Sequence, residues 1–212
     1  MIYLKSLRLF CYLCLVSILV LLCSVGSGLA MEQEELPQLE LPFVVTTAGQ
    51  SPGALMVFVL AKKAEVPCDR EDLLTVEMLK NKKDAGEPYH TIMITTGTSM
   101  KGMGAAGVDI DFELKRIEDI IVEAKAQGMT IIGSHIEGPA RRVDETDAAS
   151  IRTVIPESDI ILVREDSNED GFFTEKAEEL GVPLISFEKM PELMGIMQQL
   201  FGVSPETEAP CE

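Results

Sequence analysis

Residues 91–133 carry the pattern that decides the fold. They read TIMITTGTSMKGMGAAGVDIDFELKRIEDIIVEAKAQGMTIIG. The apolar runs 91–95 and 130–133 at the two ends are typical of buried strands, and an amphipathic helix lies between them. The inner stripe of this helix consists of Leu114, Ile117, Ile121 and Ala124. We expect Asp111 to cap the helix, after a long glycine-rich loop, and Gly128 to end it. Strand, helix and strand in this order predict one βαβ unit of a parallel sheet.

The same alternation continues on both sides of this unit. Further strands are predicted at 43–46, near Val66, at 160–163 and at 183–186, and further helices from Ser51 onward and at 75–80, 144–155, 172–180 and 191–201. In the first of these helices we expect Ser51 as the N-cap and Pro52 as the first residue, and the apolar run 55–61 predicts deep burial. We therefore predict a three-layer α/β sandwich, Rossmann-like or flavodoxin-like, with a mostly parallel sheet of about five or six strands.

The N-terminal segment has the features of a secretory signal peptide. Lys5 and Arg8 precede an uncharged run at 9–25, and Gly28 and Ala30 are small residues of the kind that signal peptidase recognises. We predict cleavage after Ala30 and export to the periplasm or the outside of the cell, with an uncleaved membrane anchor as the alternative. The predicted organisation is a signal peptide at 1–30, an acidic linker at 31–42, one α/β domain at 43–202 and a flexible acidic tail at 203–212.

The charge and the cysteine content narrow the range of partners. The formal net charge is −17, and such a surface repels the phosphates of nucleic acids and anionic lipids. We expect no nucleic acid partner, and no membrane contact after the signal is removed. Cys68 and Cys211 remain after cleavage, and in an oxidising compartment they form one disulfide or stay as two free thiols; the sequence supports both.

Polar side chains gather in the segments that follow two of the predicted strands. In parallel α/β sheets, ligands bind beyond the carboxyl ends of the strands. The candidate ligand-binding residues there are Thr98, Ser99, Lys101, His135, Arg141 and Arg142. The three cations suit a carboxylate or a phosphate, and the other side chains would orient it. The alternative is that the two arginines form surface ion pairs with the nearby acids Asp144, Glu145 and Asp147.

Motifs for cofactors and catalysis carry little weight in this sequence. Gly102, Gly104 and Gly107 match the dinucleotide fingerprint formally, but this fingerprint should turn directly from a strand into a helix, and here a loop separates it from the preceding strand. The sequence contains no Gly-x-Ser-x-Gly nucleophile motif. We expect no cofactor and no metal site.

Three function classes remain open. The first is an exported single-domain binding protein for a small, anionic ligand at the carboxyl edge of the sheet. The second is a cofactor-free hydrolase at the same place, with His135 as base and Asp109 or Asp166 as its partner. The third is a module that binds another exported protein.

Three segments resemble a known family. They are residues 99–109 (SMKGMGAAGVD), 135–142 (HIEGPARR) and 170–174 (DGFFT). On these segments, the stretch from about residue 41 to residue 201 resembles a family of exported bacterial proteins that is described only as a domain of unknown function. The resemblance implies an exported α/β domain and implies no particular activity.

Overall fold

The computed structural model of the protein describes residues 36–204 and contains a six-stranded, all-parallel sheet. The strands are β1 (Phe43–Ala48), β2 (Cys68–Arg70), β3 (Thr91–Thr96), β4 (Thr130–His135), β5 (Ile160–Arg164) and β6 (Leu184–Phe187). Their order across the sheet is β2-β1-β3-β4-β5-β6. This order confirms the predicted fold class and selects the flavodoxin-like alternative, in which the chain reverses its direction of travel across the sheet between β1 and β3.

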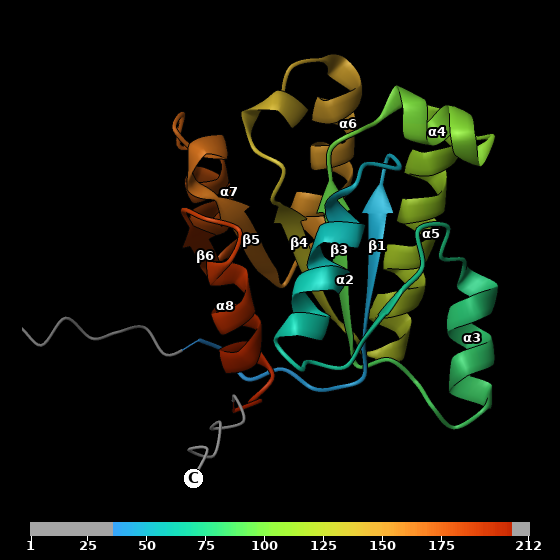
Figure 1. The fold of residues 1–212 in the computed structure, drawn as a ribbon. Coiled ribbons are helices and arrows are strands. Elements are labelled where there is room, and N and C mark those ends of the chain that lie inside the picture. Colours follow the sequence, from blue (N-terminus) through green and yellow to red (C-terminus); the bar gives the residue numbers. More distant parts are fainter. Residues whose placement is uncertain (1–35, 205–212) are drawn as a thin grey trace, which may run out of the picture. The chain divides into compact units, whose positions relative to one another are not determined.

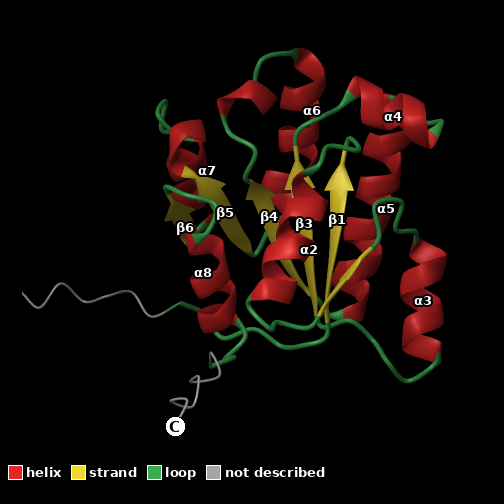
Figure 2. Cartoon of the chain, in the orientation of Figure 1, coloured by secondary structure: helices red, strands yellow, loops and turns green. Residues whose placement is uncertain are grey.

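Helices cover both faces of the sheet, which gives the three predicted layers (Figures 1 and 2). One face packs against α2 (Gly53–Lys63) and α8 (Glu192–Leu200). The other packs against α3 (Val76–Asp84), α5 (Ile110–Gln127), α6 (Glu145–Val154) and α7 (Phe172–Leu180). A short helix, α4 (Met100–Ala106), lies beyond the edge at which the strands end. We call this edge the carboxyl edge.

The core follows the two-residue period of the strands. Phe43 and Val45 of β1 lie in the cluster shared with α2 and α8, whereas Val44 lies in the cluster shared with α3 and α5. Every residue of β1 and β3 is buried, as expected for central strands covered on both faces. Burial of these apolar side chains on two sides is the main stabilising contribution to the fold.

Three local predictions are wrong. The glycine-rich loop after β3 forms α4, and Asp109 rather than Asp111 caps α5, because the Asp109 carboxylate accepts the Phe112 N–H at 2.8 Å. Ser51 does not cap α2, since the cap residue is Pro52 and makes no side-chain capping bond.

Helix α2 is also less buried than its composition predicts. Leu55 and Val59 are 45% and 42% exposed, because these two residues point away from the sheet. An apolar composition on all sides therefore did not make α2 a fully buried helix.

The described part of the predicted linker contacts the domain. Leu36, Leu39 and Leu41 pack against the α2–α8 cluster, and the Leu39 N–H donates to the Leu200 carbonyl at 2.7 Å. The predicted signal peptide at 1–30 and most of the predicted tail, with Cys211, fall outside the described residues. Between residues 36 and 204, no helix has the length and apolar character needed to cross a membrane.

Candidate functional site

The structure places the six predicted site residues along the carboxyl edge in two groups. Thr98 and Ser99 follow β3, and Lys101 is in α4. The second group consists of His135, at the end of β4, and two arginines. Arg141 is the last residue of a 3₁₀ turn, η1 (Pro139–Arg141), and Arg142 follows it. The Arg141 guanidinium joins the groups, because its Nη1 donates to the Thr98 carbonyl. The topology therefore brings together segments that are about 40 residues apart, as the rule for parallel sheets predicts.

Thr98 is held by Asp147, a buried acid that was expected to pair with the arginines. Its N–H and its hydroxyl each donate to the Asp147 carboxylate at 2.8 Å. Asp147 also accepts the Val143 N–H at 3.2 Å, and it is almost fully buried. Asp147 was an expected ion-pair partner of the arginines, but it instead fixes the loop after β3 to the start of α6. The polar groups of Thr98 therefore serve the loop itself.

Ser99 and Lys101 have separate positions. The Ser99 hydroxyl caps α4 by accepting the Gly102 N–H at 3.0 Å. Lys101 is exposed on the first turn of that helix. Gly102 allows α4 to sit directly on the loop after β1, since a Cβ at this position would lie 2.0 Å from the Gln50 carbonyl oxygen. This glycine therefore serves helix packing, which agrees with the view that the dinucleotide fingerprint is only formal.

His135 is buried, and both of its ring nitrogens have partners. Nε2 lies 3.2 Å from the Gly138 carbonyl, so the neutral ring carries its proton there, and Nδ1 lies 2.9 Å from the Thr96 hydroxyl. The ring stacks on Phe173 with centroids 5.6 Å apart. Burial lowers the pKa of His135 to about 4, because the charged form cannot be solvated. At neutral pH this histidine is an uncharged part of the core under the edge.

Arg141 is paired with a carboxylate that caps a helix. Its Nε donates to Glu137 Oε2 at 3.3 Å, and the other oxygen of Glu137 accepts the Gly53 N–H at 2.8 Å. Glu137 thus occupies the N-terminus of α2, where backbone N–H groups favour negative charge. A Cβ on Gly53 would lie 2.9 Å from this carboxylate, so a larger residue there would push the Glu137 side chain away from the helix.

Arg142 extends toward α7. It donates from Nη1 and Nη2 to the two carboxylate oxygens of Asp170, at 3.0 and 2.9 Å, and from Nη1 to the Ser167 carbonyl. Its guanidinium carbon is 5.2 Å from the ring centroids of both Phe172 and Phe173, within cation–π range. The Arg142 hydrogen bond lowers the pKa of Asp170. This arginine is therefore oriented by an acid, a carbonyl and two aromatic rings at once.

A third arginine, Arg164, belongs to the same edge. It comes from the end of β5 and binds the Asp166 carboxylate through Nε and Nη2, at 2.8 and 2.6 Å. Its side chain packs against the turn before η1, because a Cβ on Gly138 would lie 1.7 Å from Arg164 Nη2. We call Arg141, Arg142 and Arg164 the arginine cluster.

Sequence reasoning missed a buried ion pair at the β1 end of the edge. Glu113 and Arg116 of α5 bind each other at 2.9 and 3.0 Å, and their side chains are 0% and 5% exposed. Glu113 also accepts the Gly49 N–H and the Gln50 side-chain amide, and Arg116 donates to the Thr47 carbonyl. An i,i+3 pair of opposite charge is the usual pattern of a solvent-exposed helix face, so its spacing alone gave no signal of burial.

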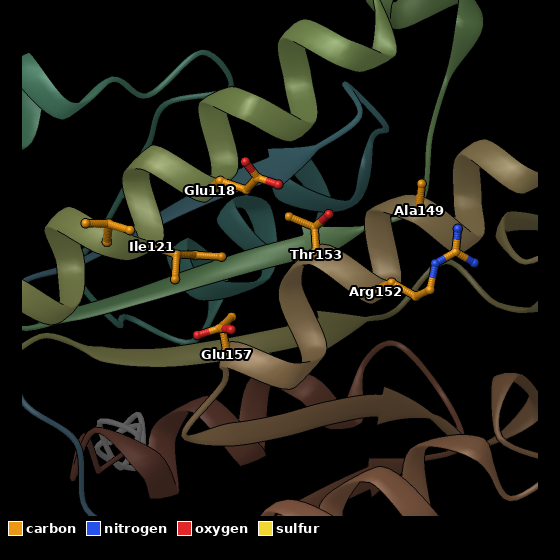
Figure 3. A pocket seen from close by; sticks show the side chains of 7 residues that line it. Glu118, Ile121, Ala149, Arg152, Thr153 and Glu157 are labelled. Atoms are coloured by element: carbon orange, nitrogen blue, oxygen red, sulfur yellow. The ribbon is translucent and has the colours of Figure 1, made fainter.

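Three surface hollows lie beside helices in the part of the chain that the structure describes. A hollow of about 160 Å³ between α6 and α7 is lined by Arg142, Ala148, Ile151, Arg152 and Phe172. A groove of about 410 Å³ between α5 and α6, drawn in Figure 3, is lined by Glu118, Ile121, Val122, Ala149, Arg152, Thr153 and Glu157. A second groove of about 410 Å³ is lined by Thr75, Val76, Glu77, Phe112, Lys115, Arg116 and Asp119. Of the six predicted site residues, Arg142 is the one that lines a hollow in this set.

Two further searches, for a metal-binding cluster and for a curated relative, give no additional information about the site. Among residues 36–204, no three His, Cys, Asp or Glu side chains are grouped so that they could hold a metal ion. No curated protein matches the sequence.

Three solved structures to which this chain is similar are distant in sequence. A GDSL-like lipase from Bacteroides thetaiotaomicron is 15% identical, with a TM-score of 0.31, and the match covers 68% of this chain and 66% of the lipase, just under two thirds of its length. The esterase EstA from Pseudoalteromonas sp. is 10% identical, with a TM-score of 0.29 and coverage of 68% of this chain and 76% of the esterase. A putative acylhydrolase from Bacteroides fragilis is 10% identical, with a TM-score of 0.33 and coverage of 76% of both chains.

A protein family model also matches this chain. The family model spans residues 40–201, which includes all six strands of the sheet and the whole arginine cluster. The resemblance of the three sequence segments to a domain of unknown function is thereby confirmed. The chain belongs to the family described as "Domain of unknown function (DUF6305)".

Proposed function

We propose that this domain binds a small anionic molecule at the carboxyl edge, with the arginine cluster as its anchor. The observation that carries the proposal is the concentration of three guanidinium groups in the segment after β4 and at the end of β5, in a chain whose net charge is −17. Guanidinium groups bind carboxylates and phosphates through paired hydrogen bonds, so they are the side chains best suited to such a ligand.

The carboxylates that pair with Arg142 and Arg164 are exposed enough for a ligand anion to replace them. Asp166 and Asp170 have side chains that are 44% and 57% exposed, whereas those of Arg164 and Arg142 are only 23% and 21% exposed. An exposed ion pair contributes about 0 to 1 kcal/mol, so a ligand anion that brings further contacts can compete with these carboxylates. The more buried guanidinium groups stay in place while this happens.

Lys101 and His135 have smaller roles in this proposal than the sequence suggested. Lys101 lies on α4 and adds positive charge near the loop after β3. His135 supports the edge from below, and its burial keeps it uncharged. A hydrolase that used His135 as its base would first have to expose the ring, so the binding function agrees better with the geometry.

A thermal-shift series tests this function. Acetate, propionate, butyrate, phosphate and sulfate are compared with chloride at equal ionic strength. A ligand at 100 times its Kd stabilises a protein by about 2.7 kcal/mol, which raises the Tm of a domain of this size by roughly 5 to 10 °C. We expect at least one anion to stabilise the protein more than chloride, and Arg142→Ala to reduce the shift. Lys176→Gln, which removes an exposed charge from α7, is the matched control and should keep it.

Equal shifts for all anions, including chloride, would refute the binding function. Export stays part of the proposal, and it rests on the sequence of residues 1–30. Cell fractionation of the full chain tests it, since a processed protein outside the cytoplasm is the expected result. Retention of the whole chain in the cytoplasm would contradict it.

A further inference from the structure

We infer that the ligand is a short-chain monocarboxylate, about three to five carbons long, which binds in the hollow between α6 and α7. Its carboxylate would bind Arg142, and its alkyl chain would contact Ala148, Ile151 and Phe172. This inference rests on the proposed function and names the ligand class and the position of that site.

The first argument is the number of hydrogen-bond donors that Arg142 has left. A guanidinium carries five N–H groups, and the contacts of Arg142 with Asp170 and the Ser167 carbonyl use three of them, all on Nη1 and Nη2. Among the described residues 36–204, Nε–H and the second Nη2–H have no hydrogen-bond acceptor. These two groups lie on the same edge of the planar guanidinium, and two parallel N–H groups are what a carboxylate needs for bidentate binding. A ligand can therefore bind without displacing Asp170.

The second argument is that Arg142 is fixed in position. Asp170 holds one end of the guanidinium, and the rings of Phe172 and Phe173 lie 5.2 Å from its centre. A side chain that is already immobilised loses little conformational freedom when a ligand binds, which favours affinity. Arg152, on the same hollow, is paired with Glu145 of its own helix, so Arg142 is the cation with free donors for the carboxylate.

The third argument is the size and chemistry of the hollow. Its volume of about 160 Å³ corresponds to roughly five water molecules at about 30 Å³ each, well below the volume of sites for larger ligands. Ala148, Ile151 and Phe172 give it apolar walls, and Ile151 is almost fully buried. An apolar wall stabilises an alkyl chain and does not solvate a second charge. These walls therefore favour a monocarboxylate over a dicarboxylate or phosphate.

Chemical-shift perturbation tests the position of the site. The protein, labelled with ¹⁵N, is titrated with butyrate, and separately with 1-butanol and inorganic phosphate. We expect butyrate to shift the amide signals of residues 142–152 and of Phe172 in a saturable way. 1-Butanol lacks the carboxylate and should bind at least tenfold more weakly, since a hydrogen bond to a charged group accounts for roughly a tenfold change or more. Phosphate lacks the alkyl chain and should also bind at least tenfold more weakly, since each buried CH₂ group contributes roughly a fourfold change in affinity.

Two substitutions separate the contributions of charge and shape. Arg142→Lys keeps the charge but removes the paired donors, and Ala148→Leu fills the hollow; each should weaken butyrate binding roughly tenfold or more. Arg70→Lys makes the same chemical change at an arginine outside both the arginine cluster and the hollow, and it should bind butyrate as the wild type does. Phe172→Ala provides a second test of the apolar wall if Ala148→Leu does not fold.

The outcomes distinguish this inference from the proposed function. If butyrate or another anion binds but the signals that move lie elsewhere, or if Ala148→Leu and Phe172→Ala both bind normally, the monocarboxylate site is wrong and the binding function stands. If no anion binds to the folded wild-type protein, both are wrong.

Discussion

Replacing Arg116 with methionine should destabilise the domain by about 3 to 5 kcal/mol, because it leaves a buried carboxylate without its counter-charge. The Glu113 side chain is fully buried and receives two hydrogen bonds from the Arg116 guanidinium. After the substitution it keeps only the Gly49 N–H and the Gln50 amide among its described donors. Two backbone carbonyls, those of Thr47 and Leu74, lose their donors as well.

Urea unfolding followed by circular dichroism measures this effect. With an m-value of about 2 kcal/mol/M, a loss of 3 to 5 kcal/mol lowers the midpoint by roughly 2 M. The control is the double variant Glu113→Leu with Arg116→Met, which removes both charges and should recover much of the lost stability. The reasoning is refuted if Arg116→Met stays within about 1 kcal/mol of the wild type, or if the double variant is less stable than the single one.

Three further predictions follow from single residues. Because burial holds the folded-state pKa of His135 near 4, below its ordinary value of 6.5, its contribution to stability is complete above pH 6.5 and is lost as the pH falls toward 4. Urea midpoints should show a loss of about 2 to 3 kcal/mol between pH 7.5 and 4.5 that His135→Asn reduces and His90→Asn does not; equal slopes in all three proteins would contradict this. Gly102→Ala should lower stability by about 1 to 3 kcal/mol in the same assay, because its Cβ would overlap a backbone oxygen. Gly104→Ala, where nothing lies within 4 Å, should be neutral or stabilising; similar values for the two variants would argue against the packing role. Burial raises the pKa of Cys68 to about 12, so iodoacetamide at pH 8 should label it much more slowly than an unfolded control, as measured by peptide mass spectrometry. Labelling at the unfolded rate would disprove this.

The architecture could be predicted because its signals are local and repeated. Apolar runs at 91–95 and 130–133, with an amphipathic helix between them, specify strand, helix and strand without any knowledge of distant residues. The wrong predictions of local structure occurred where the sequence offered two equivalent signals or a misleading one. Asp109 and Asp111 are chemically identical candidates for a cap, and only the backbone geometry decides between them. Glycines in α4 concealed a helix of one to two turns, because glycine disfavours helices except where close packing stabilises them.

The site was predictable in its place but not in its contacts. Parallel topology brings the ends of β3 and β4 to one edge, so Thr98 and Arg141 could be placed near each other. The partner of Arg142 is Asp170, 28 residues away on another loop, and no spacing rule connects the two. The burial of His135, at the end of β4, likewise depends on Phe173 of α7.

The carboxylate of Glu137 has a consequence for the search for ligands. Flavodoxin-like sheets offer a natural anion site between β1 and β3, where the first helix begins. In this chain that place already holds a negative charge of the protein's own, bonded to the Gly53 N–H and balanced by Arg141. To bind there, a phosphorylated compound would have to displace the Glu137 carboxylate, which stabilises the N-terminus of α2. Nucleotide-based screening libraries would therefore be directed at a position that a carboxylate of the protein already occupies. Compounds chosen for the β4–β5 side of the sheet are the better starting point.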